Sequence, residues 1–177
     1  MNPSEYLYEA KNQRQVILCR WSHHTPPRPR SHLKEPTPMK HLTVTAAILM
    51  HNGEILCTQR KESERDYISL KYEFPGGKVE AGESMEAALS RELKEELNLD
   101  LRVQPNHYYM TVDHTYPDVS ITMNCYICEI TNKTIECNDH HHYVWLPPSQ
   151  LDTLDWAPAD WPVVKRLMAE AESMTEL

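Results

Sequence analysis

Three glutamates stand close together in the middle of the chain. Glu92, Glu95 and Glu96 are spaced i, i+3 and i+4, so on a helix they project from neighbouring points of one face. Like charges at this spacing repel each other and weaken an isolated helix. A hard divalent cation, Mg²⁺ or Mn²⁺, takes carboxylate oxygens as ligands and would compensate this repulsion. The alternative is an acidic helix face that is only solvated.

The residues just before these glutamates are unusually rich in glycine. Gly76, Gly77 and Gly82 fall within seven residues of a chain that has only four glycines. A glycine carbonyl can approach a ligand closely because no Cβ blocks the way. A glycine loop that leads directly into the acidic helix, with Arg91 beside Glu92, favours the metal site over the solvated face.

Composition excludes several classes of protein. The chain has 177 residues and a formal net charge of −8, which fits one domain or two small ones and argues against a nucleic acid polymer as partner. The chain has no run of 18 apolar residues, so the sequence predicts no membrane span. Five cysteines and a charged N-terminal stretch without an apolar segment predict reduced thiols and a cytoplasmic protein.

A boundary is predicted near Met39. Residues 1–38 contain six basic and three acidic residues and six of the 13 prolines. This composition predicts a disordered extension, or a spurious one that precedes a true start at Met39, with a partner-binding or targeting arm as the alternative. Residues 39–177 form the predicted domain.

The domain shows an alternation of strand and helix signals. Asn52-Gly53 between two apolar runs predicts a β-hairpin with a type I′ turn. Asn98 is predicted to end a helix in the left-handed conformation. The other predicted elements are a helix over 84–97, a half-buried strand over 119–130, a strand over 143–146, a short helix from 149 and a helix over 161–170. This order predicts helices packed on a mixed sheet.

The glycine loop and the acidic helix together resemble a known signature. Gly77, five residues, Glu83, seven residues and then Arg91-Glu92-Leu93-x-Glu95-Glu96-x-x-Leu99 is similar to the Nudix box. Asn98 stands where the family usually has glycine, and asparagine tolerates the same backbone conformation. The resemblance extends over about 39–168 and is to the MutT-type branch, which includes 8-oxo-dGTP diphosphatases and CTP pyrophosphohydrolases. The segments that carry it are Cys57–Arg60, Glu73–Lys78 and Ala157–Val164.

The resemblance implies a fold, a reaction and roles for residues. The fold is an α/β/α sandwich with a mixed sheet, and the reaction is Mg²⁺-dependent (or Mn²⁺-dependent) hydrolysis of a nucleoside triphosphate to the monophosphate and pyrophosphate. Glu92 either binds metal or takes a proton from water, Arg91 orients it, and Glu83 supports the pair. The implied metal ligands are Gly76 through its carbonyl, Glu92, Glu95, Glu96 and Asp139. The implied substrate contacts are Arg60, Glu73, Phe74, Pro75, Gly76, Lys78 and Asp160, with Arg60 and Lys78 facing phosphate.

Three of these positions leave alternatives open. Asp139 aligns with a family glutamate but is one methylene shorter. Asp160 either reads the base, where a carboxylate suits an amino group such as that of cytosine and a protonated acid could donate to an oxidised guanine, or caps the last helix. Phe74 either packs near the base or serves the core.

The predicted substrate is CTP, dCTP or a modified dCTP, held by a monomer or homodimer. The first alternative is 8-oxo-dGTP, which would make the protein a DNA-repair enzyme that cleans the nucleotide pool. The second is a Nudix module that binds nucleotides without catalysis. Zinc binding by Cys125 and Cys128 is disfavoured, because residues three apart on a strand point to opposite faces, and His140–His142 are predicted to form a polar loop.

Overall fold

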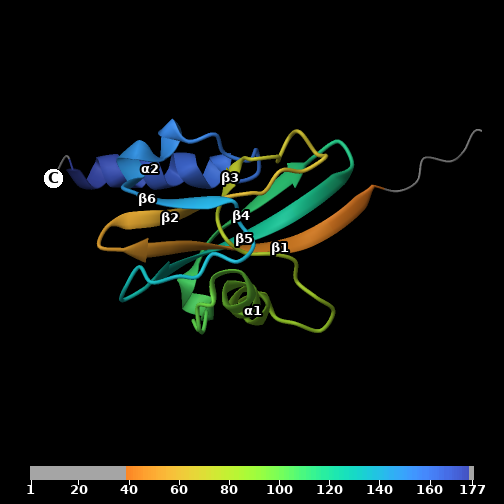
Figure 1. Cartoon of the computed structure of the whole chain (residues 1–177), viewed down its shortest axis with the longest axis horizontal. Helices are drawn as coiled ribbons and strands as arrows, with labels where there is room; N and C mark the ends of the chain where they lie inside the picture. The colour runs from red at the N-terminus through yellow and green to blue at the C-terminus, as the bar shows by residue number, and fades with distance from the viewer. Residues whose placement is uncertain (1–38, 176–177) are drawn as a thin grey trace, which may run out of the picture. The chain divides into compact units, whose positions relative to one another are not determined.

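Two helices cover the two faces of a six-stranded mixed sheet (Figure 1). The computed structural model describes residues 39–175, so the prediction for residues 1–38 lies outside the described part. The elements are β1 (Lys40–His51), β2 (Glu54–Gln59), β3 (Tyr72–Glu73), α1 (Met85–Leu97), η1 (Pro105–His107), β4 (Tyr108–Thr115), β5 (Val119–Glu129), β6 (His142–Leu146), η2 (Pro148–Thr153) and α2 (Trp161–Thr175). The predicted α/β/α sandwich with a mixed sheet is confirmed.

The sheet has the order β3-β2-β1-β5-β4, with β6 on β2. Strands β1 and β5 are parallel and pair without interruption from Lys40↔Val119 to Met50↔Glu129. All other neighbours are antiparallel. The parallel pair lies in the centre, which places it between the two helical layers.

The predicted hairpin forms, but its two strands diverge directly after the turn. Asn52 and Gly53 have φ of 51° and 79°, as a type I′ turn requires, and β1 pairs with β2 only beside this turn. Further along, residues 72–79 lie between the two strands. Residues of β3 pair with β2, while the N–H groups of Ala47 and Thr45 on β1 donate to the carbonyls of Pro75 and Gly77, each at 2.8 Å. The glycine loop is therefore held on both sides by the sheet.

Helix α1 begins and ends where the sequence predicts. Ser84 accepts a hydrogen bond from the N–H of Ala87 (3.2 Å), and Asn98 adopts the left-handed conformation (φ 50°) at the C-terminus. The helix buries Ala88, Leu89, Leu93 and Leu97. Burial of each leucine contributes about 1.5–3 kcal/mol, which offsets the repulsion among the glutamates.

Strand β5 differs from the prediction of a half-buried strand. Met123 and Cys125 belong to the core under α2, whereas Tyr126 and Cys128 belong to the core under α1. The strand is buried on both faces because it is central in a sheet that is covered on both sides. Cys125 and Cys128 do point to opposite faces, as predicted.

Several elements had no clear signal in the sequence. Strand β3 has only two residues, and β4 with η1 falls in a stretch of mixed polar and aromatic residues whose pattern predicts no element. Helix α2 extends five residues beyond the predicted end at 170. Within residues 39–175, no helix has the length and apolar character needed to cross a membrane.

Candidate active site

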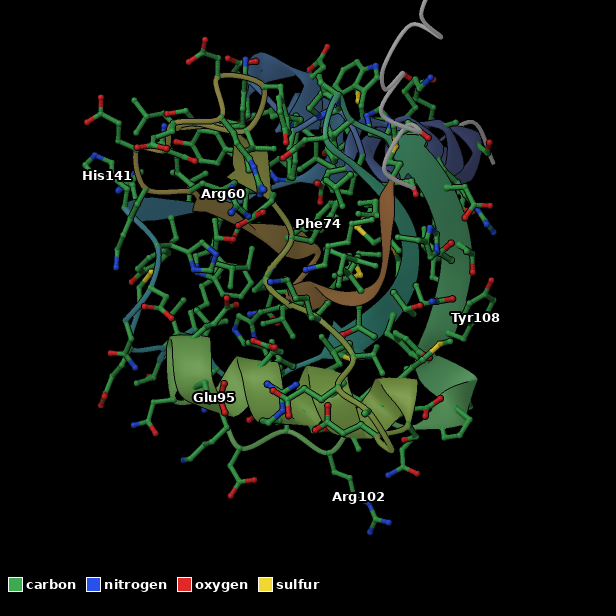
Figure 2. The ribbon with its side chains drawn as sticks, turned by 90° about the vertical axis from the view of Figure 1, so that its right-hand side faces the viewer. Arg60, Phe74, Glu95, Arg102, Tyr108 and His141 are labelled. Atoms are coloured by element: carbon green, nitrogen blue, oxygen red, sulfur yellow. The ribbon has the colours of Figure 1, made fainter. Side chains whose placement is uncertain are left out.

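A cavity of about 430 Å³ opens between α1 and the layer that contains α2. On the side towards α1, which we name the carboxylate side, it is lined by Glu92, Glu96, Gly76, Gly77 and Lys78. On the opposite side, which we name the aromatic side, it is lined by Tyr67, Phe74, Tyr116, Ala159 and Asp160. In Figure 2, Phe74 and Arg60 lie in the middle of the molecule, above α1, which carries Glu95.

Most of the predicted site residues reach this cavity, and some do not. Those that line it are Arg60, Glu73, Phe74, Gly76, Lys78, Glu92, Glu96 and Asp160. Those that do not are Glu83, Arg91, Glu95, Pro75 and Asp139. Pro75 is fully buried, and its carbonyl bonds to β1.

Arg91 organises the carboxylates of α1. Its Nε and Nη2 donate to the two carboxylate oxygens of Glu83 at 2.9 and 3.0 Å. Its Nη1 donates to Oε1 of Glu92 at 2.9 Å and reaches Glu95 at 3.4 Å. The bonds from Arg91 lower the pKa of Glu83, so this group stays charged and fixes the guanidinium. Glu92 is thereby held in one orientation at the cavity wall.

The two adjacent glycines are required for two different steric reasons. A Cβ on Gly76, whose φ is 150°, would lie 2.2 Å from the carbonyl oxygen of Thr45 in β1. A Cβ on Gly77 would lie 2.4 Å from the carboxyl group of Glu92. Gly76 is thus required by the fold of the loop, whereas Gly77 is required by the position of the Glu92 carboxylate.

Glu96 carries a partly buried carboxylate that accepts one hydrogen bond from the described residues. The N–H of Gly76 donates to its Oε2 at 3.1 Å. Burial, followed by repulsion from Glu73 and Glu92, raises its pKa to about 7 even though His140 nearby opposes the shift. A cation placed beside Glu96 would remove this penalty.

The donors around Glu96 suit a hard cation. Glu92, Glu95 and Glu96 supply oxygen, and the hydrogen bonds of the described residues use the carbonyls of Pro75 and Gly77 but not that of Gly76. Such an all-oxygen set fits Mg²⁺ or Mn²⁺. In residues 39–175, no three His, Cys, Asp or Glu side chains are already gathered around one point, and Glu95 is turned towards Arg91. A cation held by all three glutamates would require the Glu95 side chain to turn away from Arg91.

Glu73, which directly precedes the glycine loop, contacts the side chains of Arg60 and His140. Its Oε2 accepts from Nη1 of Arg60 at 2.5 Å, and its Oε1 lies 3.3 Å from Nε2 of His140. The imidazole of His140 is 4% exposed, and its Nδ1 has no partner in the described structure. His140 and His141 lie in a loop, as predicted, but the side chain of His140 is buried and His142 is the first residue of β6.

The neighbouring Asp139 has a different position. It is exposed and lies 3.7 Å from Lys61, outside the cavity lining, so its metal role stays a prediction. His141 is exposed at the edge of the molecule (Figure 2). A sequence signal for His140 did exist, because the family often has Glu-His where this chain has Asp139-His140.

Asp160 is buried immediately before α2, with 4% of its surface exposed. Its Oδ1 accepts from the N–H of Phe74 at 3.0 Å, while the N–H groups of Val163 and Val164 donate to its main-chain carbonyl. The side chain is thus bonded across to the glycine loop rather than to its own helix. Burial, then repulsion from Glu73, raises its pKa to about 8, so the group is mostly a neutral acid at pH 7.

The ring of Phe74 belongs to the core and also borders the cavity, whereas its contact with a base stays a prediction. It packs on Trp156, with 4.8 Å between ring centroids, and it also lines the cavity. Tyr67 and Tyr116 on the same side were not predicted. Their signal is weak because they come from a loop and from the β4–β5 turn, which lie far from the acidic helix in the sequence.

An α/β/α sandwich that sets an acidic helix against a glycine loop across a cavity has the architecture of a Nudix hydrolase. The family model of the NUDIX domain matches residues 39–167. The chain therefore belongs to the Nudix family, and its relatives place it on the MutT-type branch.

Two curated relatives and one solved structure illustrate this placement. The CTP pyrophosphohydrolase of Escherichia coli is 34% identical over 131 residues, which cover 74% of this chain and 94% of that protein. The 8-oxo-dGTP diphosphatase of E. coli is 31% identical over 132 residues, covering 73% and 98%. The solution structure of the MutT Nudix hydrolase from methicillin-resistant Staphylococcus aureus is 38% identical, with a TM-score of 0.60, covering 75% of this chain and 98% of that one.

Proposed function

We propose that this Nudix enzyme hydrolyses a nucleoside triphosphate to the monophosphate and pyrophosphate, with a preference for CTP, dCTP or a modified dCTP. The observation that carries the proposal is that one cavity joins the carboxylates of α1 to the buried acid Asp160. A polyphosphate can therefore lie along the carboxylate side while its base enters the aromatic side.

The carboxylate side supplies the groups for hydrolysis. Glu92, Glu95, Glu96 and the Gly76 carbonyl would hold Mg²⁺ or Mn²⁺, which neutralises phosphate charge and acidifies water when bound. Glu92 is the candidate base, because Arg91 fixes its carboxylate at the cavity wall. Lys78 and Arg60 line the same cavity and are the candidate phosphate contacts, with Glu73 restraining the guanidinium of Arg60.

The aromatic side supports the choice of cytosine. As a neutral acid, Asp160 can accept a hydrogen bond from an amino group and donate one to a neighbouring ring nitrogen. Cytosine offers this pair of groups on one edge, and the CTP pyrophosphohydrolase relative is named for a cytosine nucleotide. Phe74 provides an aromatic surface next to Asp160.

The second candidate substrate is 8-oxo-dGTP, for which the other E. coli relative is named. A neutral Asp160 can donate to a carbonyl of an oxidised guanine as well, and this role would make the protein a sanitiser of the cytoplasmic nucleotide pool. A non-catalytic binding module is disfavoured because Arg91, Glu92, Glu95 and Glu96 are all present.

The test is a pyrophosphate-release screen with Mg²⁺. The substrates are CTP, dCTP, 5-methyl-dCTP, the other natural triphosphates, 8-oxo-dGTP, ADP-ribose and a dinucleoside polyphosphate. Preference for a cytosine triphosphate is the expected result. Preference for 8-oxo-dGTP keeps the reaction and replaces the substrate, activity on ADP-ribose alone contradicts the proposed reaction, and no activity with any substrate favours the binding module.

A further inference from the structure

Tyr116, at the turn between β4 and β5, brings a hydroxyl group to the aromatic side of the cavity. Only 8% of its surface is exposed, and it lines the cavity. The N–H of Ala159 donates to its oxygen at 3.3 Å. Because Ala159 directly precedes Asp160, the phenol and the buried acid are anchored to the same two-residue segment.

The position of the Tyr116 ring is restrained on two further sides. Tyr67 stacks on it with 4.6 Å between centroids and an interplanar angle of 21°, and His114 contacts it edge-on at 4.4 Å. Tyr67 itself donates a hydrogen bond to Asp118, which lies in the same turn as Tyr116. The hydroxyl is therefore held in a defined place by its ring contacts as well as by the Ala159 bond.

The hydrogen-bonding state of the hydroxyl is the central observation. The bond from Ala159 uses a lone pair of the oxygen and leaves the phenolic proton free to be donated. Among the described residues, no acceptor is bonded to that proton. A donor that is almost buried, lines a cavity and lacks an acceptor is costly to leave unsatisfied, so a ligand that brings an acceptor gains affinity there.

We propose that Tyr116 determines base specificity by donating a hydrogen bond to a ring carbonyl of the base, while Asp160 contacts the neighbouring ring nitrogen and amino group. This inference rests on the proposed function and refines its substrate. It predicts that bases with a ring carbonyl, such as cytosine and 8-oxoguanine, are preferred over adenine, which has an amino group but no carbonyl.

The experiment compares Tyr116→Phe with the wild-type enzyme on dCTP, 8-oxo-dGTP and dATP. Phenylalanine retains the ring that stacks on Tyr67 and removes only the hydroxyl. Tyr109→Phe is the matched control, since it also removes a tyrosine hydroxyl, bonded to Glu170 at 3.0 Å, from a residue outside the cavity lining. Each variant is characterised by kcat/KM for every substrate and by its melting temperature.

For Tyr116→Phe, kcat/KM on the better of the two carbonyl-bearing substrates should fall about tenfold, as expected for one lost hydrogen bond. The value on dATP should change less than about twofold, because adenine offers this hydroxyl no carbonyl acceptor. Tyr109→Phe should leave the ratio between substrates unchanged. A purely structural Tyr116 would lower the rates on all three substrates equally, and that result, like the absence of any change, would overturn the proposal.

Failure of the proposed function is recognised separately. If the wild-type enzyme releases no pyrophosphate from any triphosphate, the proposed reaction is wrong, and the base contact is judged by calorimetric binding of dCMP, 8-oxo-dGMP and dAMP. Weaker binding of dCMP or 8-oxo-dGMP alone by Tyr116→Phe would support the contact. Unchanged or uniformly weakened binding, or no binding to the wild type, would reject it.

Discussion

The two sides of the cavity are built in different ways. The carboxylate side comes from one continuous stretch, residues 76–96, in which a glycine loop runs directly into α1. The aromatic side is assembled from four separate places in the chain, represented by Tyr67, Phe74, Tyr116 and Asp160. The first is polar and rich in hydrogen bonds, whereas the second is mainly apolar and contains one buried acid.

Under the proposed function, this difference separates the reaction from the choice of substrate. All nucleoside triphosphates carry the same phosphate chain, so groups on the carboxylate side act on every substrate alike. The bases differ, so groups on the aromatic side act on the ratio between substrates. Changes on the two sides should therefore give distinguishable kinetic signatures.

The largest effect is expected for Glu92→Gln. Loss of a general base typically costs about 10²–10⁴-fold in rate. The loss in kcat should be similar for every triphosphate, whichever nucleobase it carries. Steady-state pyrophosphate release on three triphosphates measures it, with exposed Glu172→Gln on α2 as the matched control. Full activity of Glu92→Gln would exclude this residue as the general base. A loss confined to substrates with one nucleobase would contradict the assignment of catalysis and base recognition to different sides of the cavity.

A smaller loss is expected for Arg91→Lys. Lysine keeps the positive charge but cannot form the paired bonds to Glu83 while also holding Glu92. Positioning residues around a metal site typically contribute about 10–100-fold to activity or metal affinity. Metal titrations of kcat would show a higher Mg²⁺ requirement, and Arg102→Lys, at a residue that points away from the cavity in Figure 2, is the control. An unchanged Mg²⁺ requirement and kcat would contradict this role.

Magnesium should stabilise the folded protein through Glu96. At 100 times the dissociation constant, a ligand stabilises by about 2.7 kcal/mol, or roughly 5–10 °C in a chain of this size. The shift should vanish with a chelator and with Glu96→Gln. It should shrink as the pH falls below about 7, where the raised pKa of Glu96 leaves the group protonated. A shift that Glu96→Gln retains in full, while Glu129→Gln behaves as the wild type, would place the metal elsewhere.

The last effect concerns the pH dependence of stability and is expected from the acid on the aromatic side. Burial raises the pKa of Asp160 from 3.8 to about 8, so the folded protein keeps a proton that the unfolded chain releases. Its contribution to stability is therefore present below about pH 4 and is lost as the pH rises to about 8. Asp160→Asn should make the free energy of unfolding depend less on pH over this range, as measured by urea denaturation.

The control for that measurement is Asp152→Asn, which changes an exposed aspartate on η2. It should leave the pH dependence as in the wild type. An Asp160→Asn variant with the wild-type slope would mean that Asp160 is ionised in the folded protein. It would then be a pure hydrogen-bond acceptor for the base.

The parts of the fold that follow local rules were predictable. The Asn52-Gly53 turn, the Ser84 and Asn98 caps and the stripe of leucines in α1 depend on residues within a few positions of each other. The same holds for the carboxylate side, where helical spacing alone brings Glu92 and Glu96 to one face. These features need no knowledge of what packs against them.

Other features depended on partners that are distant in the sequence. The pattern of β5 could not show that both of its faces are covered, because burial is decided by where β1 and the two helices lie. Which residue of the Asp139-His140 pair is buried next to Glu73 depends on how that loop packs on α1, and Nε2 of His140 lies 3.3 Å from Oε1 of Glu73. Single-residue shifts of this kind reverse which side chain is buried.

The sequence by itself determined the family, the acidic helix and the groups available for hydrolysis, since these are set by spacing within one segment. Only the tertiary structure decided that Gly77 makes room for Glu92, that burial raises the pKa of Asp160, and that Tyr116 is bonded to the residue before it. The physical reason is that burial and hydrogen-bond satisfaction are properties of neighbours in space. They become defined only when segments from across the chain meet.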